Sequence, residues 1–393
     1  MDRVDEVILP ENTRWLNDPD AQAVCNAIGA QGARIFFVGG CVRDALLGVG
    51  GSDVDLSTDA KPDEVIALAT TAGLKAVPTG IEHGTVTVVS GGKGFEVTTF
   101  RRDVETDGRR AVVTFSKDIS DDAVRRDFTM NALYATPNGQ VIDPLGHGVE
   151  DCLARRVRFI EDAETRIRED YLRILRYFRF HAWYADAQAG FDADALDAIA
   201  SNTDGLEKLS AERTGAELLR LLAAPDPSPA VATMRQTGVL SKVLPGSDDQ
   251  FLAPVVYLES SVESTPDALL RLASLGGENV AESLRLSRAA RKQLETLHDQ
   301  ASNGGGLAEV AYRHGFDMAQ QVAVLRAAYS GQPVLVTDLD AIDTGARAVC
   351  PVSASDLIPD FEGKALGDRL AALETRWIAS NFRLTREELM TGP

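Results

Sequence analysis

The stretch GGCVRDALLGVGGSDVD, residues 39–55, decides how the N-terminal part of this chain is interpreted. A run of strand character, RIFFV, comes directly before it. Gly39 and Gly40 then break the strand, and because they lack Cβ atoms they let the backbone turn sharply and approach a phosphate. Residues 41–47 are typical of a helix whose first amides face that phosphate, and Arg43 adds positive charge there. The pattern predicts a phosphate-binding turn.

Asp53 and Asp55 close this stretch, two residues apart in a segment of strand character. Side chains at this spacing lie on the same face of a strand, so both carboxylates can reach the same hard cation. Magnesium is the natural partner when a nucleoside triphosphate is bound, because it bridges a few carboxylates to phosphate oxygens. We expect a third acid on a neighbouring strand, and Glu96 in FEVTTF is the candidate. Each run alone is also typical of a strand–turn–helix joint, a solvated turn or an outward-facing strand glutamate.

A second run, RRDFTMNA at residues 125–132, sets Arg126, Asp127 and Asn131 among apolar neighbours. The surrounding segment, residues 123–134, is predicted to begin as a short helix. An N-terminal helix turn with ordinary acidic caps is the alternative interpretation.

The third run, EDYLRILRYFRF at residues 169–180, has polar residues at a three-residue spacing: Asp170, Arg173, Arg176 and Arg179. This spacing predicts one slanted stripe on a helix, with mainly apolar residues over the remaining surface. A plain amphipathic helix with salt bridges along the stripe is the alternative. Together the three runs meet three demands of a nucleotide-handling site: a turn for phosphate, carboxylates for metal, and arginines for anions and bases.

These runs resemble the bacterial class II tRNA nucleotidyltransferases, the CCA-adding enzymes, of the DNA polymerase β-like nucleotidyltransferase superfamily. The resemblance extends from about Trp15 to about Leu222, and more loosely to the end of the chain. It implies that Asp53 and Asp55 hold two magnesium ions, with Glu96 completing the acidic set. It also implies nucleotide contacts by ten residues: Gly39, Gly40, Arg43, Arg126, Asp127, Asn131, Asp170, Arg173, Arg176 and Arg179.

Within this set, the resemblance implies that Gly40 and Arg43 contact the triphosphate. It implies that Arg126, Asp127 and Asn131 order the ribose of the incoming nucleotide. A 2′-hydroxyl needs such paired donors and acceptors if it is to be distinguished from hydrogen.

Asp170 and Arg173 provide a way to choose a base without a nucleic-acid template. Asp170 would accept from an exocyclic amine while Arg173 donates to the neighbouring ring acceptor. Cytosine and adenine both offer an amine next to an acceptor, whereas uracil and guanine place a carbonyl where that amine would be. One such pair therefore accepts C and A and rejects U and G, which is the role that the resemblance implies for EDxxR. Arg176 and Arg179 are then interpreted as phosphate contacts.

Residues 101–122 lie between Glu96 and the second run, RRDFTMNA. They carry many charges of both signs and contain Gly108. We expect a mobile loop around a short apolar stretch, residues 111–115. The resemblance links a flexible loop here to the change from C to A addition, through an element at Asp107, Gly108 and Arg109. A solvated hairpin tip is the alternative.

The composition is that of a protein with more than one core: 393 residues, 44% hydrophobic content and a formal net charge of −19. No apolar stretch reaches membrane-spanning length, and the four cysteines are scattered without CxxC spacing. We therefore expect a cytoplasmic protein with reduced thiols, no membrane partner and no zinc site. The acidity opposes binding of a polyanion but permits a local basic stripe, expected from Arg155, Arg156, Arg158, Arg166, Arg168, Arg173, Arg176, Arg179, Lys208, Arg213, Arg220, Arg285, Arg288, Arg291 and Lys292.

The pattern changes near Glu150. Strands and helices alternate before it, and after residues 158–160, a predicted last strand, the pattern is helical to the end. We therefore expect an α+β fold, with an N-terminal nucleotidyltransferase head of mixed β-sheet and flanking helices, followed by an all-helical neck, body and tail. The predicted divisions are a catalytic head at 1–150, a neck for base selection and RNA binding at 151–224, a helical body at 225–302 and a tRNA-binding helical tail at 303–393.

One further element, SAERTGAEL at residues 210–218, resembles the SxERxxxEL element of the same family. We interpret it as a brace for the neck helices and not as part of the chemistry.

The sequence thus predicts template-independent addition of C, C and A to the 3′ acceptor end of tRNA, from CTP and ATP with Mg²⁺ as cofactor. A poly(A) polymerase or an A-only adding tRNA nucleotidyltransferase shares the motifs and is an alternative, although poly(A) polymerases of this type are usually longer and end in a basic tail. A non-catalytic RNA-binding protein on the same fold is an alternative from another class. It is opposed by intact Asp53, Asp55, Arg126, Asp170 and Arg173. The chain is expected to be a monomer or a homodimer.

Overall fold

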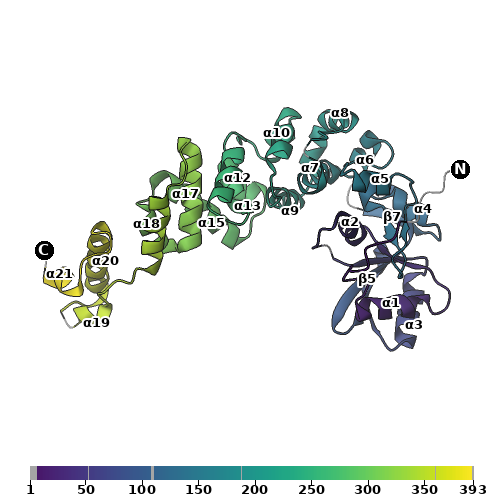
Figure 1. Cartoon of the computed structure of the whole chain (residues 1–393), viewed down its shortest axis with the longest axis horizontal. Helices are drawn as coiled ribbons and strands as arrows, with labels where there is room; N and C mark the ends of the chain where they lie inside the picture. Colours follow the sequence, from purple (N-terminus) through teal and green to yellow (C-terminus); the bar gives the residue numbers. More distant parts are fainter. Residues whose placement is uncertain (1–6, 52, 108–109, 187, 359, 392–393) are drawn as a thin grey trace. The chain divides into compact units, whose positions relative to one another are not determined.

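The computed structural model describes residues 7–51, 53–107, 110–186, 188–358 and 360–391. The chain divides into two compact units. One comprises Met1–Glu217 with Thr233–Val243, and the other comprises Leu218–Ala232 with Leu244–Pro393. The first unit holds the β-sheets, and the second is built from helices (Figure 1). The predicted α+β class, with an N-terminal mixed sheet followed by helices, is confirmed.

The main sheet of the first unit has seven strands in the order β3-β4-β5-β2-β1-β8-β9. All neighbouring strands are antiparallel except β2 and β5, which are parallel. The strands are β1 (Ile35–Val38), β2 (Asp55–Thr58), β3 (Lys75–Gly80), β4 (Thr85–Ser90), β5 (Lys93–Thr99), β8 (Tyr134–Ala135) and β9 (Val141–Ile142). The four residues of β1 are all buried, as expected of its IFFV sequence in the interior of a sheet.

The strand register brings the first motif together. Val38 pairs with Asp55 across β1 and β2, and Asp55 pairs with Glu96 across β2 and β5. The chain leaves β1 at Gly39 and continues into helix α2 (Gly40–Leu47). The turn at Gly39 and Gly40, called the phosphate turn below, therefore lies beside the carboxylates of Asp55 and Glu96 on three adjacent strands.

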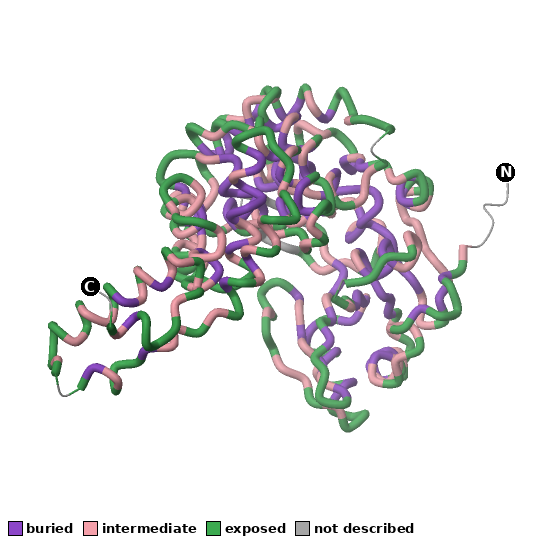
Figure 2. Tube along the Cα trace, turned by 60° about the vertical axis from the view of Figure 1, so that its left-hand side comes forward, coloured by how far each residue is buried: buried purple, intermediate pink, exposed green. Residues whose placement is uncertain are grey.

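Two helices cover part of this sheet. Helices α1 (Pro19–Gly29) and α3 (Pro62–Thr71) pack against each other, and α3 packs on β3, β4 and β5. A separate apolar cluster joins β1 and β8 to the following helices, and its buried members are Phe36, Val38, Phe100, Ala123, Ala132, Tyr134 and Ile160. Buried stretches, shown in purple in Figure 2, recur along the trace of this unit.

The prediction of a loop at residues 101–122 is wrong, because most of the described residues of this segment form two paired strands, and the hairpin given as the alternative agrees with this pairing. Strands β6 (Arg101–Asp107) and β7 (Arg110–Phe115) form a separate two-stranded antiparallel sheet. The consecutive β-formers of residues 112–115 favour a strand, and this strand pairs with the charged strand before it. Gly108 and Arg109 of the predicted DGR element lie outside the described residues.

The second motif is mostly not helical. Helix α4 (Ile119–Val124) ends before it, Phe128 is extended, and only a 3₁₀ turn, η2 (Thr129–Asn131), follows. The helix predicted to begin at residue 123 is therefore wrong. The strand predicted at 158–160 is also wrong, because it reduces to a single bridge between Phe128 and Phe159.

The neck helices are α5 (Gly148–Leu153), α6 (Ala163–Glu169), α7 (Leu172–Tyr184), α8 (Ala193–Ser201) and α9 (Ala211–Leu222). The third motif spans the α6–α7 junction, not one helix. Asp170 is extended, with φ −153° and ψ 106°, and its Oδ1 accepts from the Leu172 amide at 3.1 Å. The prediction that Asp170 lies on the helical stripe is wrong, since a short acid that caps the first amides of α7 favours the junction.

The second unit consists of helices in the described residues, and a buried ion pair lies inside it. Arg271 Nε contacts Glu259 Oε2 at 2.7 Å, and its Nη1 donates to the carbonyls of Leu222 and Ala224. Helix α10 (Ser228–Gln236) begins in this unit and ends in the first, and α11 (Val239–Val243) belongs to the first unit. The helices that follow in the second unit are α12 (Leu252–Ser261), α13 (Ala268–Leu275), α14 (Val280–Ser283), α15 (Arg288–Asn303), α16 (Leu307–His314), α17 (Phe316–Ser330), α18 (Val336–Arg347), α19 (Ala354–Leu357), α20 (Gly363–Ala379) and α21 (Arg386–Thr391).

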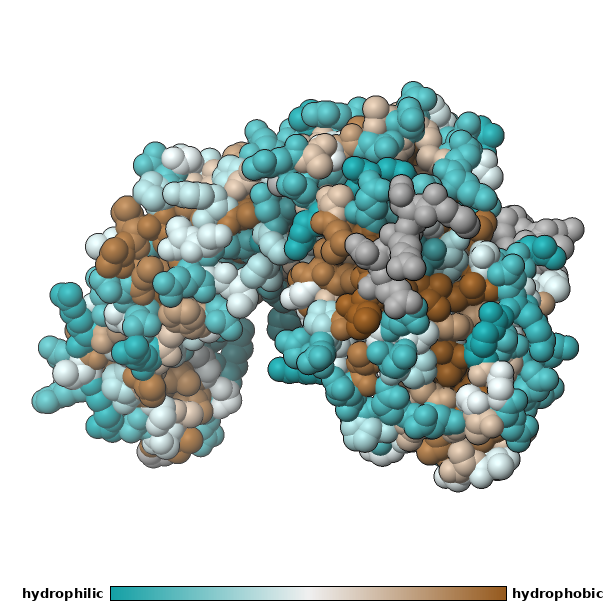
Figure 3. Space-filling view, turned by 45° about the vertical axis from the view of Figure 1, so that its right-hand side comes forward, coloured by the Kyte–Doolittle hydropathy of each residue, from teal (hydrophilic) through white to brown (hydrophobic). Residues whose placement is uncertain are grey.

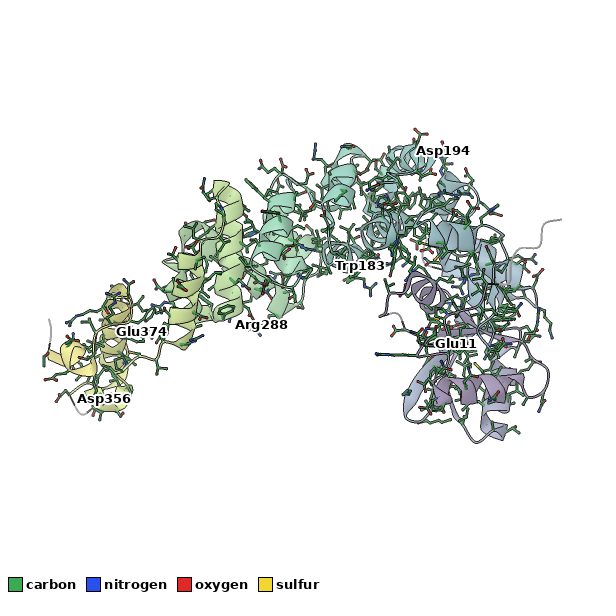
Figure 4. The ribbon with its side chains drawn as sticks, in the orientation of Figure 1. Glu11, Trp183, Asp194, Arg288, Asp356 and Glu374 are labelled. Carbon is green, nitrogen blue, oxygen red and sulfur yellow. The ribbon has the colours of Figure 1, made fainter. Side chains whose placement is uncertain are left out.

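The end of the chain forms its own aromatic cluster. Tyr312 and Phe382 pack against Trp377, and the Tyr312 hydroxyl contacts Glu374, which Figure 4 labels. No helix in the described part of the chain combines the length and the apolar character that a membrane crossing needs. On the face drawn in Figure 3, hydrophilic side chains predominate and apolar ones form smaller patches.

The α6–α7 junction is packed against a glycine, and this contact is testable. A Cβ on Gly205, in the 3₁₀ helix η3 (Thr203–Lys208), would lie 1.9 Å from Cδ1 of Tyr171. We expect Gly205→Ala to lower the melting temperature, because overpacking costs about 1–3 kcal/mol. Gly29→Ala is the matched control, since no atom lies within 4 Å of its Cβ and alanine favours helix. Equal melting temperatures for the two variants, measured by calorimetry, would contradict this packing.

Candidate active site

The phosphate turn requires glycine at its first position. Gly39 has φ 75° and ψ −122°, a backbone conformation that L side chains rarely adopt. A Cβ at this position would also lie 3.1 Å from Nη1 of Arg126 and 3.6 Å from the Asn131 carbonyl. The second motif therefore packs directly against the turn of the first.

Three carboxylates influence one another at the edge of the sheet. Loss of hydration, together with the charges of Glu96 and Asp53, raises the pKa of Asp55 to about 6, although the charge of Arg126 acts to lower it. Asp53, Asp55 and Glu96 are all exposed to solvent. The crowding makes full ionisation of this group unfavourable unless a cation is bound.

The carboxylates do not form a complete metal cage. Within the described residues, no set of three or more histidine, cysteine or acidic side chains is drawn close enough to bind a metal ion. Magnesium fits such an open site, because it is bound in proteins by one or two carboxylates, several waters and substrate phosphates. The exposed Asp53 and Asp55 meet that requirement beside a turn suited to phosphate.

Arg43, in helix α2, is buried, and its guanidinium has several partners. Its guanidinium contacts Asp44 at 2.7 Å, donates to Asn131 Oδ1 at 2.6 Å and donates to the Tyr184 hydroxyl at 2.8 Å. The Tyr184 ring lies 3.9 Å from the guanidinium carbon. Tyr184 is the last residue of helix α7, so this contact joins α2 to α7.

Asp127 and Asn131 extend this set of contacts toward α7. Asn131 donates to Asp127 Oδ1 at 2.9 Å, and Arg176 contacts Asp127 Oδ2 at 2.5 Å. Burial acts to raise the pKa of Asp127, but Arg176 and Asn131 outweigh it and lower that pKa to about 2. Asp127 is therefore a carboxylate held ionised inside the protein.

Arg179 is held by the SxERxxxEL element. Its Nε donates to Glu217 Oε2 at 2.6 Å, and Arg176 Nη1 lies 3.9 Å from the other oxygen of Glu217. Glu217 is buried in α9. The element expected to brace the neck thus contacts two members of the arginine stripe.

Asp170 and Arg173, the two residues expected to choose the base, have hydrogen-bond partners but can still accept or donate further hydrogen bonds. Arg213 donates to Asp170 Oδ2 at 2.6 Å, while Arg173 contacts Glu169 at 2.5 Å and the Arg166 carbonyl at 2.7 Å. A carboxylate offers about four acceptor sites and a guanidinium five N–H groups. The described contacts of Asp170 and Arg173 use only some of these.

Arg126 is held on one side by groups that the sequence reasoning did not assign. Its Nη2 lies 3.1 Å from Asp122 Oδ2, and its Nε donates to the Tyr134 hydroxyl at 3.3 Å. The four-residue spacing of Asp122 and Arg126 is a signal for the first contact. The roles of Tyr134 and Tyr184 had no local signal.

Two cavities of about 550 Å³ lie in the first unit. One is lined by Cys41, Asp44 and Gly48–Gly51, beside the phosphate turn. The other is lined by Arg158 and several acids between α6 and α8, and none of the residues expected to bind nucleotide or metal lines it. The first cavity is therefore the one that adjoins the candidate site.

Two family models match this chain, one over the residues that include the candidate site and one over helices that follow it. The family model of the poly A polymerase head domain matches residues 35–158, and the model described as a probable RNA and SrmB-binding site of polymerase A matches residues 191–251.

Relatives of known function span nearly the whole chain. The CCA-adding enzyme of Streptococcus pyogenes is 41% identical, covering 94% of this chain and 97% of the relative. The mitochondrial CCA tRNA nucleotidyltransferase 1 of Danio rerio is 33% identical, covering 90% and 86%.

Solved structures share the fold. The CCA-adding enzyme of Bacillus stearothermophilus in complex with CTP superposes with a TM-score of 0.72 at 27% identity, covering 92% of each chain. The Thermotoga maritima CCA-adding enzyme complexed with tRNA_CCA has a TM-score of 0.68 at 18% identity, covering 98% of each, which supports the fold alone. With its glycine turn and carboxylates at one sheet edge and relatives that match it end to end, the chain belongs to the CCA-adding enzyme family of tRNA nucleotidyltransferases.

Proposed function

We propose that this chain adds C, C and A to the 3′ end of tRNA, using CTP and ATP and releasing pyrophosphate. The observation that carries the proposal is the register of β1, β2 and β5, which sets the glycine turn, Asp55 and Glu96 side by side. Nucleotidyl transfer needs phosphate and cation binding at one place. The choice of tRNA as acceptor and of CTP and ATP as donors rests on the relatives.

The family depends on a divalent metal, and we assign magnesium to Asp53 and Asp55, with Glu96 beside them. Bound magnesium would neutralise phosphate charge and lower the pKa of the attacking hydroxyl. The raised pKa of Asp55 supports the assignment, since this carboxylate gains most when a cation offsets its neighbours.

The phosphate turn positions the triphosphate for attack. The 3′-hydroxyl of the tRNA attacks the α-phosphorus, and pyrophosphate leaves in line with it. Gly39 and Gly40 let the backbone amides at the start of α2 approach the phosphates. Arg43 acts there through the charge of its buried guanidinium, because its N–H groups are directed to Asp44, Asn131 and Tyr184.

Asp127 and Asn131 are assigned to the ribose, as the second motif implies. Both are buried beside the turn, and Asp127 is held ionised by Arg176. An ionised carboxylate beside an amide offers the acceptor and the donor that a 2′-hydroxyl can use.

Asp170 and Arg173 are assigned to the Watson–Crick edge of the incoming base. Their partners fix their orientation: Arg213 holds one oxygen of Asp170, and Glu169 holds one arm of Arg173. A base edge requires groups that are held in place yet still able to accept and donate. Arg176 and Arg179 are assigned to phosphate contacts at the same end of α7.

The helices of residues 225–302 and 303–393 are assigned to the body and tail that bind tRNA. We place the reaction in a reducing compartment, the cytoplasm. Support comes from the four free cysteines, and burial raises the pKa of Cys25 and Cys41 to about 12. Such thiols are poor nucleophiles and do not readily form disulfides.

A second function is favoured by one observation, the match of residues 35–158 to a poly A polymerase head domain. A poly(A) polymerase or an A-only adding enzyme would use the same carboxylates and turn. Incorporation of C distinguishes these activities from CCA addition.

The decisive assay uses tRNA that lacks CCA, with magnesium and with CTP or ATP alone or together. We expect two C residues from CTP alone and CCA from both nucleotides. Asp53→Asn and Asp55→Asn should abolish both additions, because the carboxylate charge that binds the cation is lost. Binding of tRNA, measured by gel shift, should remain within about twofold, since a few surface carboxylates contribute little to it.

Glu259→Gln is unsuitable as a control, because it leaves Arg271 buried without its ionic partner. Glu164→Gln is suitable, because Glu164 forms an exposed ion pair with Arg168. Appreciable incorporation by either aspartate variant would refute the metal assignment. Addition of A without C by the wild type would favour the second function.

The base-selection hypothesis predicts a change of specificity at Asp170. Asp170→Asn offers both a donor and an acceptor, so it should relax rejection of UTP or GTP by up to roughly 1–3 kcal/mol, the discrimination typical of base-edge contacts. Incorporation of each of the four nucleotides onto tRNA ending before CCA measures this. Arg213→Lys is a companion variant that keeps the positive partner of Asp170.

A structural role at Asp170 would give a different result. An Asp170→Asn variant with a lower melting temperature and the wild-type preference for C and A would show that the carboxylate only joins α6 to α9.

The phosphate-contact hypothesis predicts that Arg176→Ala raises the KM for CTP and ATP by the same factor. A charge-assisted hydrogen bond contributes about 1.5–3 kcal/mol, so the increase should be about tenfold or more. Arg168→Ala, at an exposed ion pair, is the control. Arg176→Lys separates charge from loss of the Asp127 contact. An increase for one nucleotide alone would instead place Arg176 at the base edge.

A further inference from the structure

A buried acid and a buried tyrosine lie beneath the phosphate turn and have no assigned role. Asp122, near the end of α4, and Tyr134, in β8, are both 0% exposed. The Tyr134 hydroxyl donates to Asp122 Oδ2 at 2.7 Å. Ser57, two residues after Asp55 on β2, lies 3.5 Å from the same oxygen. The pair is thus attached to the strand that carries Asp55.

Arg126 connects this pair to the site. Asp122 Oδ2 contacts its Nη2 at 3.1 Å, and Tyr134 accepts from its Nε at 3.3 Å. The Tyr134 ring also lies 5.4 Å from the guanidinium carbon. The remaining nitrogen, Nη1, is the one that a Cβ at Gly39 would meet at 3.1 Å. Nη2 and Nε of the guanidinium are therefore held by Asp122 and Tyr134, and Nη1 lies at the Gly39 turn.

The contacts give Arg126 one orientation and a charge directed to the site. Burial acts to raise the pKa of Asp122, but Arg126 and Arg125 outweigh it, so the pKa is lowered and the carboxylate stays ionised. Arg126 in turn acts electrostatically on Asp55. A planar guanidinium held at two nitrogens is preorganised to bind an anion with the third.

Packing alone does not require the tyrosine hydroxyl. The Tyr134 ring is edge-on to both Phe36 and Phe100, with ring centroids 6.4 Å apart in each case. A phenylalanine would make the same ring contacts. The hydroxyl adds only its contacts to Asp122 and Arg126.

We propose that Asp122 and Tyr134 are positioning residues that hold Arg126 so that its Nη1 binds a phosphate of the incoming nucleotide at the Gly39 turn. The proposal rests on the proposed nucleotidyl transfer. It replaces the ribose contact expected of Arg126 with a phosphate contact, and it leaves the ribose to Asp127 and Asn131.

Nucleotide binding tests the proposal without any transfer step. The probes are CTP, inorganic triphosphate and cytidine, each titrated calorimetrically into the full chain with magnesium. Tyr134→Phe should lower the binding affinity for CTP and for triphosphate by the same factor, about five- to tenfold, and leave the affinity for cytidine unchanged. Tyr177→Phe is the matched control, because Tyr177 is also fully buried and its hydroxyl accepts from the Asp192 amide, away from Arg126.

A double-mutant cycle separates positioning from general stability. On an Arg126→Lys background, Tyr134→Phe should cause no further loss of triphosphate affinity, since the group that it positions is gone. Asp122→Asn, if it folds, should behave like Tyr134→Phe. Arg126→Lys should itself weaken triphosphate more than Tyr134→Phe does.

Three results would overturn the proposal: unchanged triphosphate affinity in Tyr134→Phe, an equal loss for cytidine, or a full loss that persists on the Arg126→Lys background. A wild-type chain that binds triphosphate but does not extend tRNA would refute the proposed function and leave this inference standing. A wild-type chain that binds none of the probes would refute both.

Discussion

The site depends on the parallel pairing of β2 with β5, which places Asp55 beside Glu96. Like charges at this separation repel, and the pKa of Asp55 rises to about 6 as a result of lost hydration and the neighbouring acids. A protein tolerates such crowding where a cation or substrate relieves it. The glycine turn between β1 and α2 and the guanidinium of Arg126, whose charge opposes that of Glu96 and Asp53, complete the candidate site.

A second requirement is that every charge buried around the turn has a partner. Arg43, Asp127 and Glu217 are each less than 9% exposed, and each contacts a group of opposite charge. Removing one member of a buried pair costs about 3–5 kcal/mol, because the other charge remains without compensation. The contacts from Arg43 through Asn131 to Asp127 and Arg176 therefore join the turn to the neck helix as one polar network.

The sequence predicted the parts of the site that are local in the chain. The glycine turn and Glu96 on a strand next to Asp55 lie where expected. The strand expected to carry both Asp53 and Asp55 begins only at Asp55, so the prediction that both side chains lie on one strand face is wrong. The sequence did not predict the partners, because these are fixed by tertiary packing. Arg43 and Tyr184 are 141 residues apart, and Asp170 and Arg213 are 43 residues apart. No local pattern encodes such distances.

The errors have physical causes as well. A three-residue spacing predicted a continuous helical stripe through Asp170, but a short acid before a helix satisfies the first free amides and marks its start. Charge density in residues 101–122 predicted a mobile loop, although the consecutive β-formers of residues 112–115 favour a strand that pairs with residues 101–107. In both cases backbone hydrogen bonding decided the local structure, and the charge pattern did not.

The neck arginines also change how the acidity of the chain is understood. With 59 acidic and 40 basic residues, the protein opposes a polyanion on average. Several arginines of the predicted neck do not act as unpaired cations, because Arg173, Arg179 and Arg213 each contact a carboxylate. Cations neutralised in this way release few counterions on RNA binding and add little to its salt dependence. We propose that exposed cations such as Arg288, labelled in Figure 4, and Lys292 supply that contribution, and that the paired arginines shape the nucleotide site.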